Sequence, residues 1–482
     1  MTFTRSLLVA ITSACLLLAA GTGTHSQASG LPGDTKSAIT AQLKRAEGAR
    51  GTAGCVVIDL DTGATLYSHN PDQPLAPASN MKLVTTAAAL KQLGSEFEFK
   101  TLLLDHGKAG GPLYVLAGGD PNLSGRFHGG DVLAIYRGWA EQLKKAGISE
   151  VAGLRYDSTI FGGESFCTGW PRDDQYVKWY CAEVSAFAFN DNCIGVRVIP
   201  GKAGQPATIE TTPATAAVKI VNETKTLPGR KGAEIGIVRP RGENTITVKG
   251  NVYEQATWGY FIDVTVHDPA LYAASVLRET LEACGIKVNG EVQPVTLGID
   301  DVKGMRVLVE HKSSLLSALP AINTNSQNLH AEMLFRQLGV RYCGKGTFKT
   351  SSAAVEEFLR KQKWWTPGAA IIDGSGLARE NRVTAAQLAK LLEAMSSEPS
   401  FEAFRDSLAV AGETGTLEKR LGDKAIKGKV FAKTGYIRGV RALSGYVITD
   451  SRRVAFSVLM NDCVYSKEAT DEIVSILART LK

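Results

Sequence analysis

The sequence lacks the motifs that would place it in several large functional classes. Its seven histidines are scattered, it has no H-E-x-x-H, and no two cysteines are spaced C-x-x-C, so a zinc site is not predicted. Neither G-x-S-x-G nor G-x-G-x-x-G occurs, which excludes the nucleophile elbow of α/β-hydrolases and the dinucleotide fingerprint. The surplus of 54 basic over 48 acidic residues is thin and unclustered, so nucleic acid is not an expected partner.

Long apolar runs are also absent, except at the start of the chain. Arg5 precedes an uncharged run from Ser6 to Ala20, and small residues follow it. This order predicts a secretory signal peptide over residues 1–28, because the run is short for a membrane span. The rival interpretations are an uncleaved anchor and a lipid anchor on Cys15, although Cys15 lies too early, inside the apolar run. We therefore expect an exported protein.

Cysteine is scarce after the signal peptide. Seven cysteines remain, and an odd number in an exported protein implies at least one free or intermolecular thiol. Cys181 and Cys193 are the closest pair and the first candidates for a disulfide, while buried free cysteines remain the alternative. A chain of 482 residues with 44% apolar residues folds without a metal or disulfide framework. Its length predicts about three domains, either in a row or threaded through one another.

The two ends of the mature chain predict one antiparallel sheet. Residues 53–69 have the pattern of a hairpin, and a helix is expected over 79–94. Three further strands and a closing amphipathic helix are predicted near the other end, over 430–434, 441–449, 454–460 and 470–481. A hairpin, a meander and a closing helix suit one sheet covered by helices.

The middle of the chain, from about 100 to 296, has a different pattern, in which predicted strands alternate with occasional helices. Strands predicted over 244–252 and 258–266 indicate a β-rich module. Two helices are predicted over 131–147 and 268–285, each ended by a glycine. No low-complexity linker separates these regions.

Three short motifs carry the candidate chemistry. Ser79-Asn80-Met81-Lys82 opens the helix after the hairpin, Ser326-Gln327-Asn328 opens a second helical run, and Lys433-Thr434-Gly435 lies on the first strand of the meander. Each alone is also explained as a helix cap or a strand end. Together, in this order, they match the active-site motifs of serine β-lactamases and penicillin-binding proteins.

The chemistry of the motifs explains their residue types. Ser79 and Lys82 are three apart, so their side chains share one face of the helix, whose N-terminus favours developing negative charge. A neutral lysine can act as the base if its pKa falls from about 10.4 to near 7. Burial lowers that pKa, and the ammonium of Lys433 would lower it further. Ser326 can relay the proton to the leaving amine, and Asn328 offers an amide to the substrate backbone.

Over essentially the whole mature chain, the sequence resembles the low-molecular-mass class C penicillin-binding proteins, a family of D-alanyl-D-alanine carboxypeptidases and endopeptidases. Beyond the three motifs, residues 118–121, 373–379 and 412–417 look like segments of that family. The first two motifs lie much farther apart than in ordinary β-lactamases, which makes a plain β-lactamase a poor interpretation. The family places two extra domains between them.

The resemblance implies an α+β fold. Its catalytic domain is β-lactamase/transpeptidase-like, an antiparallel sheet flanked by helices, with two β-rich domains inserted between the first and second motifs. We expect residues 29–98 and 297–482 to form the catalytic domain and residues 99–296 to form two nested sub-domains. In that fold the last strand lies beside the first, which would bring Cys463 to Cys55 as a second disulfide.

The resemblance also implies a set of substrate contacts. Lys433-Thr434-Gly435 would line the cleft and hold the terminal carboxylate of the substrate, and Arg379 matches a family arginine near the substrate side chain. The backbone N–H groups of Ser79 and Tyr436 would form the oxyanion hole. Tyr436 and Arg438 stand where relatives often carry small or neutral residues, which bears on side-chain preference.

The predicted function is that of a secreted serine D-Ala-D-Ala carboxypeptidase, endopeptidase or both. Ser79 is the expected acylated nucleophile, Lys82 its base, and Ser326 and Asn328 the second catalytic motif. The expected substrates are peptidoglycan stem peptides and cross-links in the periplasm or cell envelope of a bacterium, with β-lactam antibiotics as covalent inhibitors. Membrane association is expected to be peripheral at most, and no metal or cofactor is implied.

Two alternative functions remain open. The first is a serine β-lactamase or esterase on the same site, which rapid deacylation would distinguish. The second is a non-catalytic wall-binding or antibiotic-sensing module, which a broken motif would mark.

Overall fold

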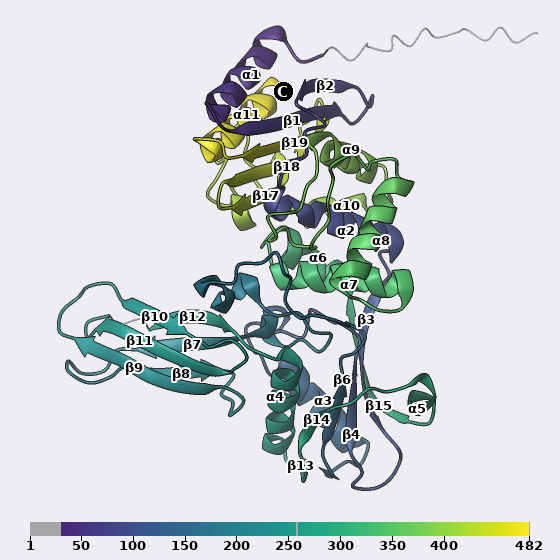
Figure 1. Cartoon of the computed structure of the whole chain (residues 1–482), viewed down its shortest axis with the longest axis vertical. Coiled ribbons are helices and arrows are strands. Elements are labelled where there is room, and N and C mark those ends of the chain that lie inside the picture. The colour runs from purple at the N-terminus through teal and green to yellow at the C-terminus, as the bar shows by residue number, and fades with distance from the viewer. Residues whose placement is uncertain (1–29, 257–258, 482) are drawn as a thin grey trace, which may run out of the picture.

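The two ends of the chain build one six-stranded antiparallel sheet (Figure 1). The computed structural model describes residues 30–256 and 259–481, so the predicted signal peptide and Cys15 lie outside the described residues. From edge to edge the sheet runs through β16 (Ala409–Val410), β17 (Val430–Ile437), β18 (Val440–Ile448), β19 (Arg453–Asn461), β1 (Thr52–Asp59) and β2 (Thr65–His69). The first strand of the chain therefore lies beside the last one, as the resemblance implies.

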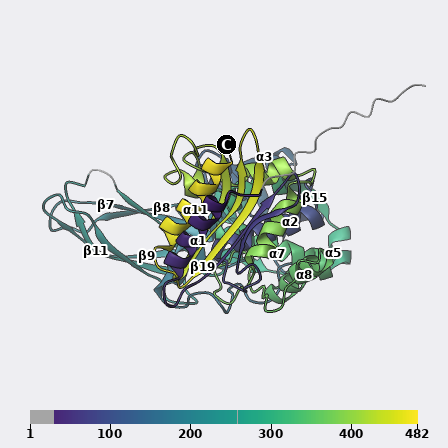
Figure 2. The ribbon, with the colours of Figure 1, turned by 90° about the horizontal axis from the view of Figure 1, so that it is seen from above.

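Helices cover both faces of this sheet because side chains alternate along its strands. On one face, Cys55 and Val57 of β1 pack with α1 (Gly33–Glu47) and α11 (Ser466–Thr480), which lie side by side in Figure 2. The other face packs against a layer of helices, namely α2 (Met81–Gln92), α6 (Leu315–Asn323), α7 (Asn328–Cys343), α8 (Phe348–Lys361), α9 (Ala385–Met395) and α10 (Phe401–Asp406). The candidate motifs at the starts of α2 and α7 lie in this second layer.

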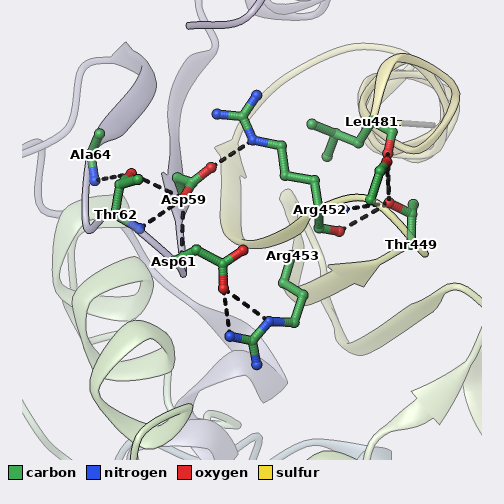
Figure 3. A network of polar contacts seen from close by, with 9 residues as sticks. Asp59, Asp61, Thr62, Ala64, Thr449, Arg452, Arg453 and Leu481 are labelled. Carbon is green, nitrogen blue, oxygen red and sulfur yellow. Dashed lines mark hydrogen bonds and ion pairs between the residues drawn. The ribbon is translucent and has the colours of Figure 1, made fainter. Parts of the chain in front are cut away.

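Ion pairs fix the end of β1 to the turn between β18 and β19 (Figure 3). Arg452 Nε donates to Asp59 Oδ2 at 2.6 Å, and Arg453 Nη2 donates to Asp61 Oδ1 at 2.5 Å. Burial would raise the pKa of Asp59, but hydrogen bonds from Arg452 and Thr62 outweigh it and lower that pKa. The two ends of the chain are thus joined by charge as well as by strand pairing.

The segment between the first two motifs forms two units, one nested in the other (Figure 1). The outer one, called the sheet unit here, has a five-stranded mixed sheet of β14 (Val292–Pro294), β6 (Leu154–Asp157), β4 (Leu113–Ala117), β3 (Glu98–Asp105) and β15 (Arg306–Ser314). The sheet unit also contains helices and a pair of short strands. These are α3 (Ala134–Lys145), α4 (Pro269–Ala283), α5 (Ile299–Lys303) and the paired strands β5 (Glu150–Val151) and β13 (Lys287–Val288).

The inner unit, called the β arm here, projects to the side of the molecule in Figure 1. It consists of two three-stranded sheets built from β7 (Cys193–Ile199), β8 (Thr208–Thr212), β9 (Lys219–Leu227), β10 (Glu234–Val238), β11 (Thr245–Tyr253) and β12 (Tyr260–Thr265). Val196 and Ile194 of β7 share a buried cluster with Val248 and Ile246 of β11, so the two sheets pack face to face.

The structure corrects the predicted end of the insertion. The return to the terminal sheet and its helices was predicted at residue 297, but β15 pairs with β3 along its whole length, from Arg306 beside Asp105 to Ser314 beside Glu98. The strand therefore completes the sheet unit, and the catalytic-type fold resumes at Leu315, where α6 begins.

The structure also corrects both predicted disulfides, since Cys55, Cys181, Cys193 and Cys463 are all free thiols. The register places Cys55 opposite Val458, whereas Cys463 follows the end of β19. The Cys463 thiol donates to the Thr52 carbonyl at 3.5 Å instead. The alternative of buried free cysteines holds for Cys181 and Cys193, which are both buried. Within the described residues, no helix is both long and apolar enough to span a membrane.

Candidate active site

The first motif lies where a loop that contains Pro74 and Pro77 becomes a helix. Ser79 is in the short 3-10 turn η1 (Ala78–Asn80), and Lys82 is in the first turn of α2. Lys82 Nζ donates a hydrogen bond to Ser79 Oγ at 3.0 Å. Lys82 is completely buried, whereas Ser79 is partly exposed. A partly exposed hydroxyl thus contacts a lysine that is buried from solvent.

The second motif meets the first through the same lysine. Lys82 Nζ donates to Asn328 Oδ1 at 2.6 Å, and Asn328 opens α7. The Asn328 amide also donates to the carbonyl of Tyr180, in η4 (Trp179–Cys181) of the inserted segment, at 2.8 Å. Ser326 lies two residues earlier in the loop between α6 and α7, half-buried and with a φ of 61°.

The third motif runs along β17 beside the first. Asn80 Nδ2 donates to the Lys433 carbonyl at 2.6 Å, and Ser444 Oγ of β18 donates to Asn80 Oδ1 at 2.8 Å. A Cβ at Gly435 would lie 2.8 Å from the Pro77 carbonyl oxygen, so glycine permits this close approach. Thr434 Oγ1 donates to Thr416 Oγ1 at 2.8 Å, which brings in η6 (Gly415–Leu417). The three motifs therefore converge from three separate elements.

Burial controls the charge of both lysines. Burial lowers the pKa of Lys82 to about 7, although the charges of Asp373 and Glu332 oppose the shift. Burial, followed by the charge of Lys82, lowers the pKa of Lys433 well below its usual range. The sequence predicted two ammonium groups that repel each other. In the structure that repulsion acts on Lys433, and desolvation is the main cause at Lys82.

A loop that supports Lys82 was missed as a functional feature, although residues 373–379 were noted as a family-like segment. Lys82 Nζ donates to the Ser375 carbonyl at 2.9 Å, and the Ser375 N–H donates to Glu332 Oε1 at 2.7 Å. Burial and the charge of Asp373 raise the pKa of Glu332 to about 8. Glu332 lies one helical turn after Asn328 on α7, and this spacing was the only sequence signal for it.

The carboxylate of Asp373 holds the rest of this loop. It accepts hydrogen bonds from the Trp170 indole N–H at 2.8 Å and from the backbone N–H groups of Gly376 and Ala378, each at 2.7 Å. Because Trp170 belongs to the inserted segment, the insertion helps to place the carbonyl that Lys82 contacts.

The two remaining predicted residues lie at the edge of the site. Tyr436 is 64% exposed, with the Arg441 guanidinium 4.2 Å from its ring centre. Arg379 is exposed and donates to the carbonyl of Arg438, in the turn between β17 and β18. The contacts of both side chains are with the turn and strand around residues 438–441, away from the Ser79–Lys82 pair.

This arrangement supports acyl transfer. The Ser79 hydroxyl is a group of the kind that can serve as nucleophile, a lysine whose pKa is near neutral contacts it, and two further motifs lie beside it.

Comparison with known proteins agrees with this chemistry. The family model described as the D-Ala-D-Ala carboxypeptidase 3 (S13) family matches residues 36–480. The chain is 36% identical over 432 residues to the D-alanyl-D-alanine carboxypeptidase of Actinomadura sp. (strain R39), covering 85% of this chain and 77% of the relative. It is 26% identical over 423 residues to D-alanyl-D-alanine carboxypeptidase DacB of Haemophilus influenzae, covering 85% of each.

The fold has a solved counterpart in penicillin binding protein 4 (dacB) from Haemophilus influenzae. The TM-score is 0.77 at 24% identity, and the match covers 92% of this chain and 98% of the other. The predicted α+β fold of the β-lactamase/transpeptidase type is thereby confirmed. The resemblance drawn from the three motifs is confirmed as well, because the chain belongs to the D-Ala-D-Ala carboxypeptidase 3 (S13) family of serine hydrolases.

Proposed function

We propose that Ser79 is the nucleophile with which this D-Ala-D-Ala carboxypeptidase cleaves peptidoglycan stem peptides. The observation that supports this assignment is the 3.0 Å hydrogen bond between Ser79 Oγ and the buried amine of Lys82. A lysine with a pKa of about 7 is neutral in a large fraction of molecules at neutral pH, so it can accept the hydroxyl proton.

The reaction follows from these positions. Lys82 Nζ takes the proton from Ser79 Oγ, which forms a bond to the carbonyl carbon of the penultimate D-alanine. The backbone N–H groups of Ser79 and Tyr436 receive the oxyanion. Ser326 then donates a proton to the leaving amine as the C–N bond breaks, and the proton held by Lys82 replaces it. Water finally hydrolyses the acyl-enzyme by the same steps in reverse order.

The terminal carboxylate of the substrate is assigned to Lys433, Thr434 and Gly435. Without substrate, burial beside Lys82 disfavours the charged form of Lys433. An incoming carboxylate would favour that form and raise the pKa again, because an opposite charge nearby stabilises an ammonium. Arg379 and Tyr436, at the exposed end of β17, are placed to contact the substrate side chain.

Two substrate types fit the same chemistry. In a stem peptide the leaving amine belongs to D-alanine, and in a cross-link it belongs to the diamino acid of a second stem. Penicillins acylate the same serine in this proposal. A relative of similar fold has been crystallised in complex with a β-lactam, at a TM-score of 0.71. The proposed location of the enzyme is the periplasm or cell envelope, where such substrates occur.

Covalent labelling tests the assignment. The protein is incubated with a fluorescent penicillin, and we expect one label per molecule on Ser79 in the wild type and none in Ser79→Ala. Ser397→Ala, at an exposed serine, serves as the control and should label normally. Equal labelling of the wild type and Ser79→Ala would overturn the proposal.

The fate of the label separates the remaining alternatives. A persistent adduct together with release of D-alanine from a D-Ala-D-Ala peptide is the expected result. Rapid loss of the adduct with little D-alanine release would identify a β-lactamase, and labelling without any turnover would identify a sensing module.

A further inference from the structure

A turn at the base of the β arm has an unusual backbone. Asn190, Asp191 and Asn192 have φ values of 48°, 57° and 52°, so three consecutive residues that are not glycine adopt the left-handed region. This region is sterically unfavourable for residues with a Cβ, although Asn and Asp tolerate it best. Strain of this kind persists only where surrounding contacts impose it.

Hydrogen bonds with residues close to it in the sequence hold this turn. Asn192 is fully buried, accepts from the Phe189 N–H at 3.1 Å and donates to the Glu183 carbonyl at 2.8 Å. Asn190 Nδ2 donates to the Cys193 carbonyl at 3.1 Å. The side chain between them, Asp191, makes no bond within the turn and is directed at a different part of the molecule.

Asp191 contacts the second catalytic motif. Its Oδ2 accepts a hydrogen bond from Gln327 Nε2 at 2.9 Å and another from Arg126 Nη2 at 2.5 Å. Gln327 is 7% exposed and stands between Ser326 and Asn328. The Gln327 backbone N–H is held by the Ala321 carbonyl at 2.8 Å, so both its ends are fixed.

The contact between Asp191 and Gln327 lies next to Ser326, a motif residue whose own backbone conformation is unusual. Ser326 has a φ of 61°, a conformation that its own side chain does not favour. The two residues that follow Ser326 are both held, Gln327 by Asp191 and Asn328 by Lys82, so the backbone of Ser326 is fixed from its C-terminal side.

We propose that Asp191 is a positioning residue that aligns Ser326, through Gln327, for proton donation to the leaving amine. This inference rests on the proposed role of Ser326. The step it supports transfers a proton from Ser326 Oγ to the departing nitrogen while the C–N bond breaks and the acyl bond to Ser79 forms. A leaving group that departs without a proton does not need this alignment.

The chemistry supplies a selective test. Two substrates are compared that share one acyl group ending in D-alanine. One has D-alanine as its amine leaving group, and the other has the corresponding thiol acid, which leaves as a thiolate without a proton from the enzyme because a thiol is far more acidic than an amine. The value of kcat/KM reports the steps up to acylation in both cases.

The variants are chosen to avoid new backbone strain. Asp191→Gly removes the carboxylate, and glycine accepts the positive φ. Asp191→Asn keeps an acceptor for Gln327 in the same shape. Gln327→Met removes the partner amide at similar length. Asp263→Asn is the matched control, because Asp263 lines the same cavity of about 430 Å³ as Asp191 but makes no hydrogen bond to Gln327.

We expect Asp191→Gly and Gln327→Met each to lower kcat/KM for the peptide about 10- to 100-fold and for the thioester by less than about 3-fold. The double variant should be no worse than either single one, because both break the same link. Asp191→Asn and Asp263→Asn should stay within about 3-fold of the wild type on both substrates.

Two other results would overturn the inference or the proposed function, and they can be told apart. If both substrates slow equally in Asp191→Gly, or if the single effects multiply in the double variant, Asp191 has a merely structural role and the inference is wrong. If the wild type fails to take the penicillin label at Ser79, the proposed function itself fails. The final extent of penicillin labelling, read after long incubation, checks that the nucleophile and fold of each variant are intact. Its rate is not the control, because opening the β-lactam ring also requires a proton on the departing nitrogen.

Discussion

Lys82 is a cationic side chain with no exposed surface, which is an expensive arrangement for a protein interior. Its amine donates to Ser79 Oγ, Asn328 Oδ1 and the Ser375 carbonyl, so all three of its proton positions are used. None of these acceptors carries a full charge, and desolvation therefore outweighs them. Burial, rather than a neighbouring histidine, is what suits this amine to its proposed role as the base.

The pH dependence of acylation follows from that balance. In the proposed mechanism the neutral amine of Lys82 is the active form, and its pKa is about 7. We therefore expect kcat/KM for penicillin acylation to rise with pH through about 7 and to level off above it. Stopped-flow acylation between pH 5 and 9 measures this limb. Lys82→Arg should remove the limb and most of the rate, since a guanidinium stays protonated. A limb centred above pH 9 would exclude Lys82 as the base.

At the scale of elements, local patterns predicted the strands well. The hairpin of β1 and β2 and the meander of β17, β18 and β19 were predicted within a few residues. Strands can be recognised in this way because their pattern of apolar and polar residues is local in the sequence. The helix α1 was not predicted, although Ile39, Leu43 and Ala46 recur at helical spacing on its buried face.

Contacts between elements could not be predicted in the same way. The bonds from Glu332 to the 374–375 backbone and from Asn328 to the Tyr180 carbonyl join segments that are distant in the chain. No local pattern specifies such pairs, because their geometry depends on how whole elements pack. The three motifs could therefore be identified from the sequence, whereas the residues that hold them in place became evident only in the structure.

The approach of the 373–379 loop to η1 gives a test at this scale. Gly376 has a φ of 82°, and a Cβ there would lie 1.8 Å from the Ala78 carbonyl oxygen, next to the nucleophile. We expect Gly376→Ala to reduce the rate of penicillin labelling at least about 100-fold, because displacement of η1 misaligns Ser79.

The matched control is Gly344→Ala, at the end of α7. Its φ of 79° is almost the same, but no atom lies within 4 Å of the added Cβ. It should cost about 1 kcal/mol of unfolding free energy in urea and leave labelling unchanged. Equal labelling rates in the two variants would show that the contact with Ala78 is unimportant.

At the scale of the whole molecule, the spacing of the motifs predicted a nested chain, and the structure shows one. The end of the insertion was predicted too early because β15 joins a sheet whose other strands begin at residue 98, and only strand pairing reveals that membership. The disulfides were predicted from proximity in sequence or in fold type, which does not fix the separation of two sulfur atoms.

The free cysteines of the molecule should differ measurably in their reactivity toward an alkylating reagent. Burial raises the pKa of Cys55, Cys167 and Cys181 to about 12, whereas Cys343 is exposed. In native protein, iodoacetamide should alkylate Cys343 first and leave these three unmodified until the chain unfolds. Peptide mass spectrometry after timed quenching measures the order. Detection of a Cys181–Cys193 or Cys55–Cys463 linked peptide without reductant would contradict it.

The pairing of β1 with β19 also determines when the enzyme can become active. Thr52 lies opposite Asn461, so β1, which stands between β2 and β19, has no partner on one side until residue 461 has been synthesised. The sheet unit and the β arm are complete earlier, and domains fold largely in the order in which they emerge. Ser79 can be aligned with Lys433 only after that last strand pair closes, which we expect to keep a growing chain from cleaving or trapping any acyl donor.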